Sequence, residues 1–167
     1  LADVLRREIR MAQTESEILG LQFRLGQLYQ EKLSQIMSAV ECYRDILATT
    51  PGHSASTTAL ELLFEEGQHQ LEIAEILEPL YRMNQQWERL VRILEVQLDR
   101  LEGQEERVQA IQRLAEICEQ RLGDPARAFQ FWGRALGIDL QSELVAEELQ
   151  RLAAFIAGWE ELVALYA

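Results

Sequence analysis

The sequence predicts an all-α fold, a helical-hairpin repeat solenoid of about ten antiparallel helices. Three observations lead to this prediction. Apolar residues recur at helical spacing along all 167 residues, with only short interruptions. The chain has 3 prolines, which leaves little room for the turns of an all-β fold. A shift of about 89 residues superimposes the chain on itself without a gap, as in repeat architectures.

Five helices are expected in the first half of the chain, over residues 1–12, 15–33, 36–49, 54–66 and 70–83. The third stops at Thr50-Pro51-Gly52, because proline lacks the N–H that continues a helix and glycine reaches left-handed conformations freely. Gly67 separates the last two helices. The apolar stripes of the first two helices are Leu1, Val4, Leu5 and Ile9, and Leu21, Leu25, Leu28 and Tyr29.

Five more helices are expected in the second half, over residues 86–101, 105–122, 125–136, 142–156 and from Trp159 onward. Gly103 and Gly123 punctuate two of the junctions. Asp124 and Pro125 begin the eighth helix well, because aspartate caps the free N–H groups and proline tolerates the first turn.

The internal repeat relates residues 1–78 to residues 90–167, and its identities fall on the apolar stripe. A competing shift of about 72 residues aligns 86–91 with 158–163. The longer unit corresponds to five helices and the shorter to four, and the sequence leaves both open. Because no linker-like composition interrupts the chain, one continuous unit over 1–167 is predicted. The chain begins with Leu1 and ends inside an apolar stretch, so a segment of a longer protein is expected.

Charge and composition exclude several classes of function. The chain has 16 basic against 28 acidic residues, a net charge of -12, whereas nucleic acids and anionic membranes select basic surfaces. No apolar run is long enough to insert in a membrane. Cys42 and Cys118 are too far apart in sequence for a metal knuckle. We therefore expect no nucleic-acid partner, no membrane insertion, no metal and no cofactor.

Two runs of small and aromatic residues recur in the chain. The first is Leu25-Gly26-x2-Tyr29 followed by Ala39-x3-Tyr43-x2-Ile46-x4-Pro51. The second is Leu114-Ala115-x2-Cys118 followed by Ala128-x3-Trp132-x2-Ala135, with Leu140 at the place of the proline. Small residues suit positions where two helices cross closely, and aromatic rings fill the space around the crossing.

These runs resemble the tetratricopeptide repeat, a helix–turn–helix unit of about 34 residues. In both runs the turn is one residue longer than in that family. Two good units and looser ones extend the resemblance over nearly the whole chain, which looks like a segment of the large bacterial proteins of the family. The resemblance implies a non-enzymatic protein-interaction scaffold, in which the first helix of each pair lines a concave groove for a peptide or a partner helix.

When the groove positions of tetratricopeptide repeats are aligned with this sequence, the groove lining is acidic and amide-rich. Such a lining would attract a basic or polar segment. Known grooves that grip a C-terminal carboxylate need Lys and Arg at these positions, so that activity is not expected. The candidate groove residues are Phe23, Gln27, Gln30, Glu31, Gln112, Glu116, Glu119 and Gln120. If the helix over 70–83 is also an inner helix, Glu72, Glu75 and Arg82 join them.

No catalytic constellation is evident in the sequence, and an enzyme is not expected. His53 and His69 lie in turns without metal-ligand spacing. Cys42 and Cys118 are expected to be buried small apolar residues, and the tryptophans at 87, 132 and 159 to pack at helix crossings.

Two other functions stay open beside the scaffold. One is a regulatory or sensor segment coupled to an effector domain outside this sequence. The other is self-association through the ends of the array, where apolar faces lack a neighbour. The residues expected on those faces are Leu1, Val4, Leu5, Leu162, Leu165 and Tyr166.

Overall fold

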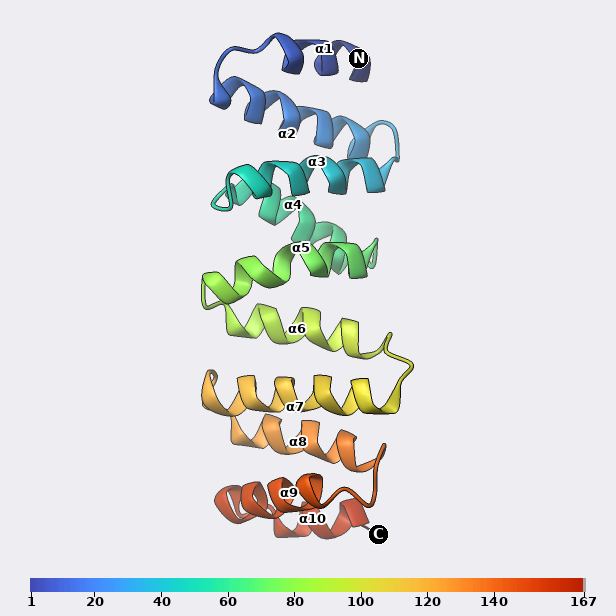
Figure 1. The fold of residues 1–167 in the computed structure, drawn as a ribbon, viewed down its shortest axis with the longest axis vertical. Helices are drawn as coiled ribbons and strands as arrows, with labels where there is room; N and C mark the ends of the chain where they lie inside the picture. The colour runs from blue at the N-terminus through green and yellow to red at the C-terminus, as the bar shows by residue number, and fades with distance from the viewer. Residues whose placement is uncertain (167) are drawn as a thin grey trace. The chain divides into compact units, whose positions relative to one another are not determined.

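The computed structural model describes residues 1–166, and within this range the chain is all-helical, with ten helices and no strand (Figure 1). The predicted fold class is confirmed at this level. The first five helices are α1 (Ala2–Met11), α2 (Glu15–Glu31), α3 (Ile36–Thr49), α4 (Ser54–Glu65) and α5 (Gln70–Met83). The others are α6 (Trp87–Leu98), α7 (Gln104–Gln120), α8 (Pro125–Leu136), α9 (Glu143–Ile156) and α10 (Trp159–Tyr166).

The expected helix bounds differ most from the structure at the end of α6. The periodicity predicts a helix as far as residue 101, but α6 ends at Leu98. The amides of Arg100 and Leu101 each donate to a carbonyl three residues earlier, so the chain tightens into a turn there. The apolar Leu101 continues the pattern without continuing the helix.

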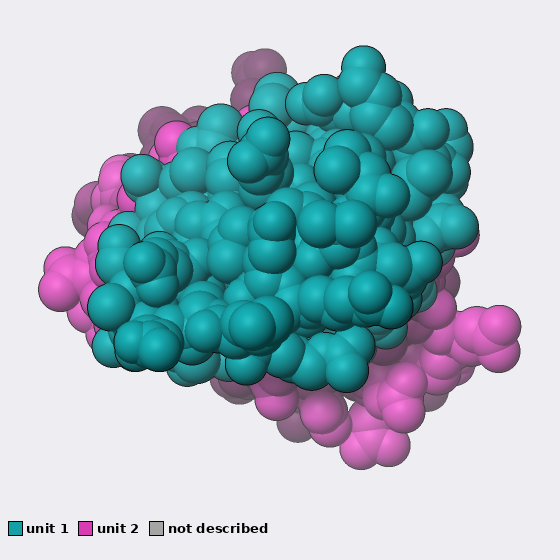
Figure 2. Space-filling model, turned by 90° about the horizontal axis from the view of Figure 1, so that it is seen from above, with its two compact units in different colours: residues 1–80 teal, residues 81–167 magenta. Residues whose placement is uncertain are grey.

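The chain divides into two compact units, unit 1 (Leu1–Leu80) and unit 2 (Tyr81–Ala167) (Figure 2). The boundary falls within α5. One uninterrupted solenoid over 1–167 stays a prediction.

The positions at which helices begin agree with the longer repeat spacing for four pairs of helices, and four pairs also agree with the shorter spacing. Helices α7, α8, α9 and α10 each begin about 89 residues after α2, α3, α4 and α5. The shorter shift of about 72 residues relates the starts of α2, α4, α5 and α6 to those of α6, α8, α9 and α10 within one residue, but it places the start of α3 inside α7. The four pairs of starting residues are Glu15 and Gln104, Ile36 and Pro125, Ser54 and Glu143, and Gln70 and Trp159.

The turns after α2 and α7 share one backbone geometry. Ser34 and Gly123 occupy equivalent places in them and have left-handed φ angles of 50° and 65°. After the left-handed residue, the amide of Gln35 donates to the carbonyl of Tyr29 over 3.0 Å, and the equivalent bond in unit 2 measures 2.9 Å. The two turns therefore have the same length and the same left-handed position.

In unit 1, α2 and α3 cross closely at Gly26. A Cβ atom on Gly26 would lie 2.6 Å from Cε1 of the Tyr43 ring, so only glycine fits there. Tyr43 itself has no exposed surface. Its hydroxyl donates to Oε1 of Gln30 over 2.9 Å, and its ring lies 5.6 Å from that of Phe23. Steric fit and a hydrogen bond therefore both fix the crossing.

In unit 2, the same crossing is built from different residues. Ala115 takes the place of glycine and Trp132 takes the place of tyrosine, and both are buried. One apolar cluster joins α7, α8 and α9 around them. Because α8 packs against both α7 and α9, it forms the layer behind these two helices.

Three expectations about apolar residues are wrong. Leu5 and Leu162 were expected on open end faces, yet they are only 3% and 7% exposed. Each points toward the neighbouring helix, since α1 packs on α2 and α10 packs on α9. Trp159 was expected to pack at a helix crossing, but it is 52% exposed at the start of α10. Periodicity locates an apolar stripe and does not reveal which edge of the stripe meets a neighbour.

Candidate functional site

A hollow of about 320 Å³ lies on unit 2, and it collects four of the residues that the sequence places on a groove. We call it the unit 2 hollow. Its lining comes from three helices. Helix α7 gives Gln112, Glu116, Glu119 and Gln120, α8 gives Trp132, and α9 gives Leu144, Glu148 and Arg151.

Helical spacing places these side chains on facing sides of α7 and α9. The four α7 residues follow at steps of four, three and one, so they share one face of that helix. The three α9 residues follow at steps of four and three, with the same result. Trp132 of α8 also lines the hollow and is 4% exposed.

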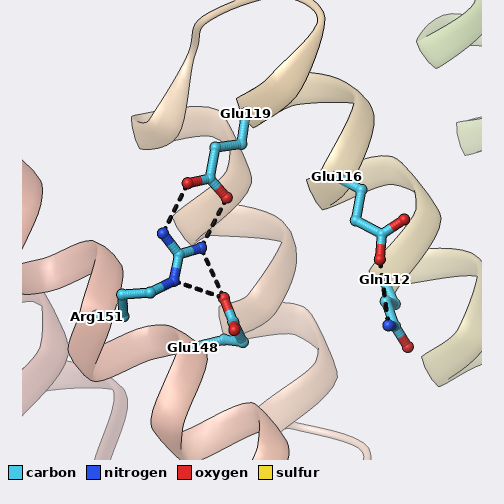
Figure 3. Close-up of polar contacts among 5 residues, drawn as sticks. All are labelled: Gln112, Glu116, Glu119, Glu148 and Arg151. Atoms are coloured by element: carbon cyan, nitrogen blue, oxygen red, sulfur yellow. Dashed lines mark hydrogen bonds and ion pairs between the residues drawn. The ribbon is translucent and has the colours of Figure 1, made fainter.

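One cation, Arg151, joins two carboxylates of the hollow (Figure 3). Its two terminal nitrogens each donate to an oxygen of Glu119 over 2.7 Å. Its Nε and one terminal nitrogen donate to Oε2 of Glu148 over 3.0 and 2.7 Å. Bidentate contacts of this kind are shorter and more directional than an ordinary surface ion pair. Arg151 thus ties α9 to α7 across the hollow.

The Arg151 contacts change the protonation behaviour of the pair. Hydrogen bonding from Arg151 lowers the pKa of Glu119, against the opposing effect of partial burial. The two carboxylates raise the pKa of the Arg151 guanidinium. At neutral pH Glu119 and Arg151 are therefore both charged, and the guanidinium is hydrogen-bonded to both Glu119 and Glu148.

Glu116 lies apart from this ion network. Its Oε1 accepts a hydrogen bond of 3.2 Å from the side-chain Nε2 of Gln112, one helical turn earlier. In Figure 3 the Glu116 carboxylate faces away from Arg151. The Glu116 side chain is exposed. The hollow is therefore lined by three carboxylates and one guanidinium, and no basic side chain among residues 1–166 pairs with Glu116.

Sequence reasoning missed Glu148 and Arg151. The groove positions were transferred only to the first helix of each recognisable repeat, whereas the hollow also uses α9. One signal was present: Glu148 and Arg151 are three residues apart, a spacing that pairs side chains on a helix. The partner Glu119 lies 32 residues away in sequence, and only the tertiary structure brings it to Arg151.

In unit 1, the predicted groove residues of α2 form a surface of different chemistry. Phe23 and Gln30 are half-buried and belong to the Tyr43 crossing. Gln27 and Glu31 are exposed. The surface is thus aromatic and amide-rich, with a single carboxylate among the predicted residues.

The predicted residues of α5 lie elsewhere. Glu72 and Glu75 line a hollow of about 380 Å³ together with residues of α3, among them Arg44, and no residue of α2 lines it. Glu72 also lies 3.9 Å from His69. Arg82 is exposed near the end of α5. The structure therefore does not bring the α2 set and the pair Glu72 and Glu75 into one hollow.

The other reactive side chains have structural surroundings. His53 caps α4, since its Nδ1 accepts from the amide of Ser56 over 3.2 Å. Burial raises the pKa of the Cys118 thiol to about 11, and the same cause raises that of the half-buried Cys42 to about 11. Within residues 1–166, no three His, Cys, Asp or Glu side chains are placed to hold a metal ion.

No helix among the described residues is both long and apolar enough to span a membrane. Comparisons of the chain with protein-family models, with curated proteins and with solved structures give no match.

Proposed function

We propose that this chain is a non-enzymatic protein-interaction scaffold, and that the unit 2 hollow binds a peptide or partner helix that carries a lysine or arginine. The sequence resemblance to tetratricopeptide repeats motivates the scaffold role. The choice of site rests on one observation: side chains of α7 and α9 line the same hollow. The four α7 residues in it are candidate groove residues that the sequence resemblance had already selected.

The charge of the hollow favours a basic partner. Three carboxylates oppose one guanidinium, and the chain as a whole has a net charge of -12. Because Arg151 already satisfies Glu119 and Glu148, an incoming cation gains most by contacting Glu116. An incoming anion would have to compete with two carboxylates for Arg151, so a free C-terminal carboxylate is a poor partner.

An apolar surface lies next to the acidic one. Leu144, which is 47% exposed, and Trp132 both line the hollow. A lysine side chain can lay its aliphatic stem on such a surface while its ammonium reaches Glu116. This combination suits an amphipathic segment better than a uniformly charged one.

The test is a titration with a fluorescently labelled peptide containing Leu and Lys, and with the same peptide in which every Lys is replaced by Gln. We expect the Lys peptide to bind more tightly and to weaken as salt is raised. Glu116→Gln should weaken its binding about two- to fivefold, as for loss of one exposed ion pair.

Glu147→Gln is the matched control, since Glu147 is an exposed carboxylate on α9 that does not line the hollow. Both variants change the net charge equally. If the two variants weaken binding to the same extent, or if the Gln peptide binds as tightly as the Lys peptide, the hollow is not a site for a basic segment.

A further inference from the structure

A second hollow, of about 380 Å³, is lined by α3 and α5, and every lining residue belongs to unit 1. We call it the unit 1 hollow. The lining residues of each helix follow at steps of one, three or four, so each helix contributes one face. Most of the lining is apolar. The residues are Met37, Val40, Arg44, Leu47 and Ala48 of α3, and Glu72, Glu75, Ile76, Pro79 and Leu80 of α5.

The equivalent place in unit 2 is filled by a side chain. The shift of about 89 residues pairs Arg44 with Gly133 and Ile76 with Leu165. Leu165 packs directly on Gly133, since a Cβ atom on this glycine would lie 3.2 Å from both Cδ atoms of the leucine. In unit 1 an arginine stands at the place of the glycine, and the hollow is open. The opening is therefore a particular feature of α3 and α5 rather than a gap that each repeat leaves.

A backbone acceptor of α5 faces the unit 1 hollow. Pro79 lies inside the helix and has no N–H, so the carbonyl of Glu75, four residues earlier, lacks its helical donor. A helical carbonyl points toward the residue four positions later, and both of these residues line the hollow. The free carbonyl therefore lies on the side of α5 that forms the wall. Free helical carbonyls carry partial negative charge and favour a cationic donor.

The same wall carries two carboxylates. Glu72 and Glu75 are both exposed and line the hollow. Glu72 lies 3.9 Å from His69, whereas no hydrogen bond or ion pair engages the Glu75 carboxylate within residues 1–166. The cation of the lining, Arg44, belongs to α3, and its Nε lies 3.6 Å from Asp45. The α5 wall therefore offers acceptors for an incoming cation beside an apolar floor.

From these observations we propose that the unit 1 hollow binds an amphipathic helix of a partner protein. Its apolar side chains would pack on the buried floor of Val40, Leu47 and Leu80, and a lysine or arginine beside them would contact Glu75. The α3 lining spans residues 37–48, which is about 16 Å of helix axis, or about three turns. A helix bound in a groove places its apolar side chains at i, i+3, i+4 and i+7, and this length accommodates them.

The cation fixes how the partner helix lies in the hollow. One ammonium has three donors, so it can bond to the Glu75 carboxylate and to the free Glu75 carbonyl together. Its aliphatic stem can lie on the apolar floor. This site is separate from the unit 2 hollow, and binding to either does not require binding to the other.

The test is a titration of the isotope-labelled chain with two synthetic amphipathic helices, followed by the NMR signals of the backbone amides. One helix carries Leu at i, i+3, i+4 and i+7 with a single Lys beside them. In the other, norleucine replaces the Lys, which keeps the aliphatic stem and removes the ammonium. We expect the amides of α3 and α5 to shift and to saturate with both helices. Shifts confined to α7 and α9 would support the unit 2 hollow and overturn the present proposal, as would no shifts at all.

Glu75→Gln tests the charged wall. We expect it to lower the preference for the Lys helix over the norleucine helix about two- to fivefold, as for loss of one exposed ion pair. Glu66→Gln is the matched control, because Glu66 is exposed at the end of α4 and does not line the hollow. Both variants change the net charge equally. If the two variants change the preference to the same extent, or if neither changes it, the wall does not select the cation and the proposal is wrong.

Ala48→Phe tests the location of the site, since Ala48 is an exposed residue of the lining and the added ring fills the hollow. It should abolish the α3 and α5 shifts with both helices. Ala55→Phe is its control on an exposed residue of α4 outside the hollow, and it should leave these shifts unchanged. Circular dichroism verifies that both variants fold. Shifts that persist in Ala48→Phe, or that Ala55→Phe abolishes as well, would overturn the proposal.

Discussion

The contact between Gly26 and Tyr43 allows a sharp test of how unit 1 is held together. Gly26→Ala adds a methyl group whose carbon would lie 2.6 Å from Cε1 and 3.1 Å from Cζ of Tyr43. Carbon atoms in ordinary contact are about 3.5–4.0 Å apart, so the ring must move by about 1 Å. The ring has no exposed surface, and its hydroxyl is held by Gln30, so it has little room to yield.

The magnitude follows from two opposing effects. Overpacking a tight core costs about 1–3 kcal/mol. Replacing glycine by alanine inside a helix contributes about 1 kcal/mol in the other direction. Gly26→Ala should therefore be neutral to destabilising by about 2 kcal/mol. The sign of the change in unfolding free energy does not by itself separate the steric effect from helix propensity, so a reference substitution is needed.

Gly20→Ala is that reference, because Gly20 lies in the same helix and a Cβ there would meet nothing within 4 Å. Both substitutions change helix propensity and the unfolded chain in the same way. We expect Gly20→Ala to stabilise by about 1 kcal/mol, and Gly26→Ala to be less stable than it by about 1–3 kcal/mol.

The assay is urea unfolding followed by far-ultraviolet circular dichroism. All three tryptophans, at 87, 132 and 159, lie in unit 2, so their fluorescence follows unit 2 and gives an internal reference. Two compact units need not unfold in one step, so the two signals are fitted separately. Equal stability of Gly26→Ala and Gly20→Ala would refute the steric reading of the α2–α3 crossing.

Two further predictions concern backbone strain and pH. Ser34→Gly should stabilise the chain by about 1 kcal/mol in urea unfolding, since a residue with a Cβ is strained at a φ of 50°. Gly123→Ala should destabilise it by a similar amount, because Gly123 has a φ of 65°. Changes of the same sign in the two variants would contradict this explanation. Hydrogen bonding from Arg151 lowers the pKa of Glu119 in the folded chain below its ordinary value of 4.5, so this carboxylate contributes stability above that pH and the contribution is lost as the pH falls through the folded pKa. Glu119→Gln should therefore flatten the loss of stability in urea unfolding below about pH 4.5, whereas the exposed control Glu147→Gln should leave it unchanged.

Local signals made the helices predictable. Thr50-Pro51-Gly52 marked the end of α3, and Asp124 before Pro125 marked the start of α8. Both ends could be predicted because capping and helix-breaking residues act on the backbone of their own segment. The end of α6 was overestimated because Leu101 keeps the apolar spacing while the backbone turns. A periodic side-chain pattern does not record where the backbone hydrogen bonds change.

The candidate site was predictable on one helix and not on the other. The resemblance to tetratricopeptide repeats selected Gln112, Glu116, Glu119 and Gln120, and the helical repeat angle places these four on one face of α7. The sequence did not reveal the cation that bridges two carboxylates of the hollow, because Arg151 and Glu119 lie 32 residues apart in sequence. The expected acidic and amide-rich lining of the hollow therefore also contains an arginine that two of its carboxylates share.

By itself, the sequence determined the helices, their approximate ends and the run of small and aromatic residues around Gly26 and Tyr43, since all of these depend on neighbours along one helix or across one turn. The tertiary structure decided the rest. It fixed which edge of each apolar stripe is buried, as for Leu5 and Leu162, and which helices share a hollow, as for α7 and α9. These features depend on how one helix is rotated and packed against another, and that is set by the fit of side chains far apart in the sequence.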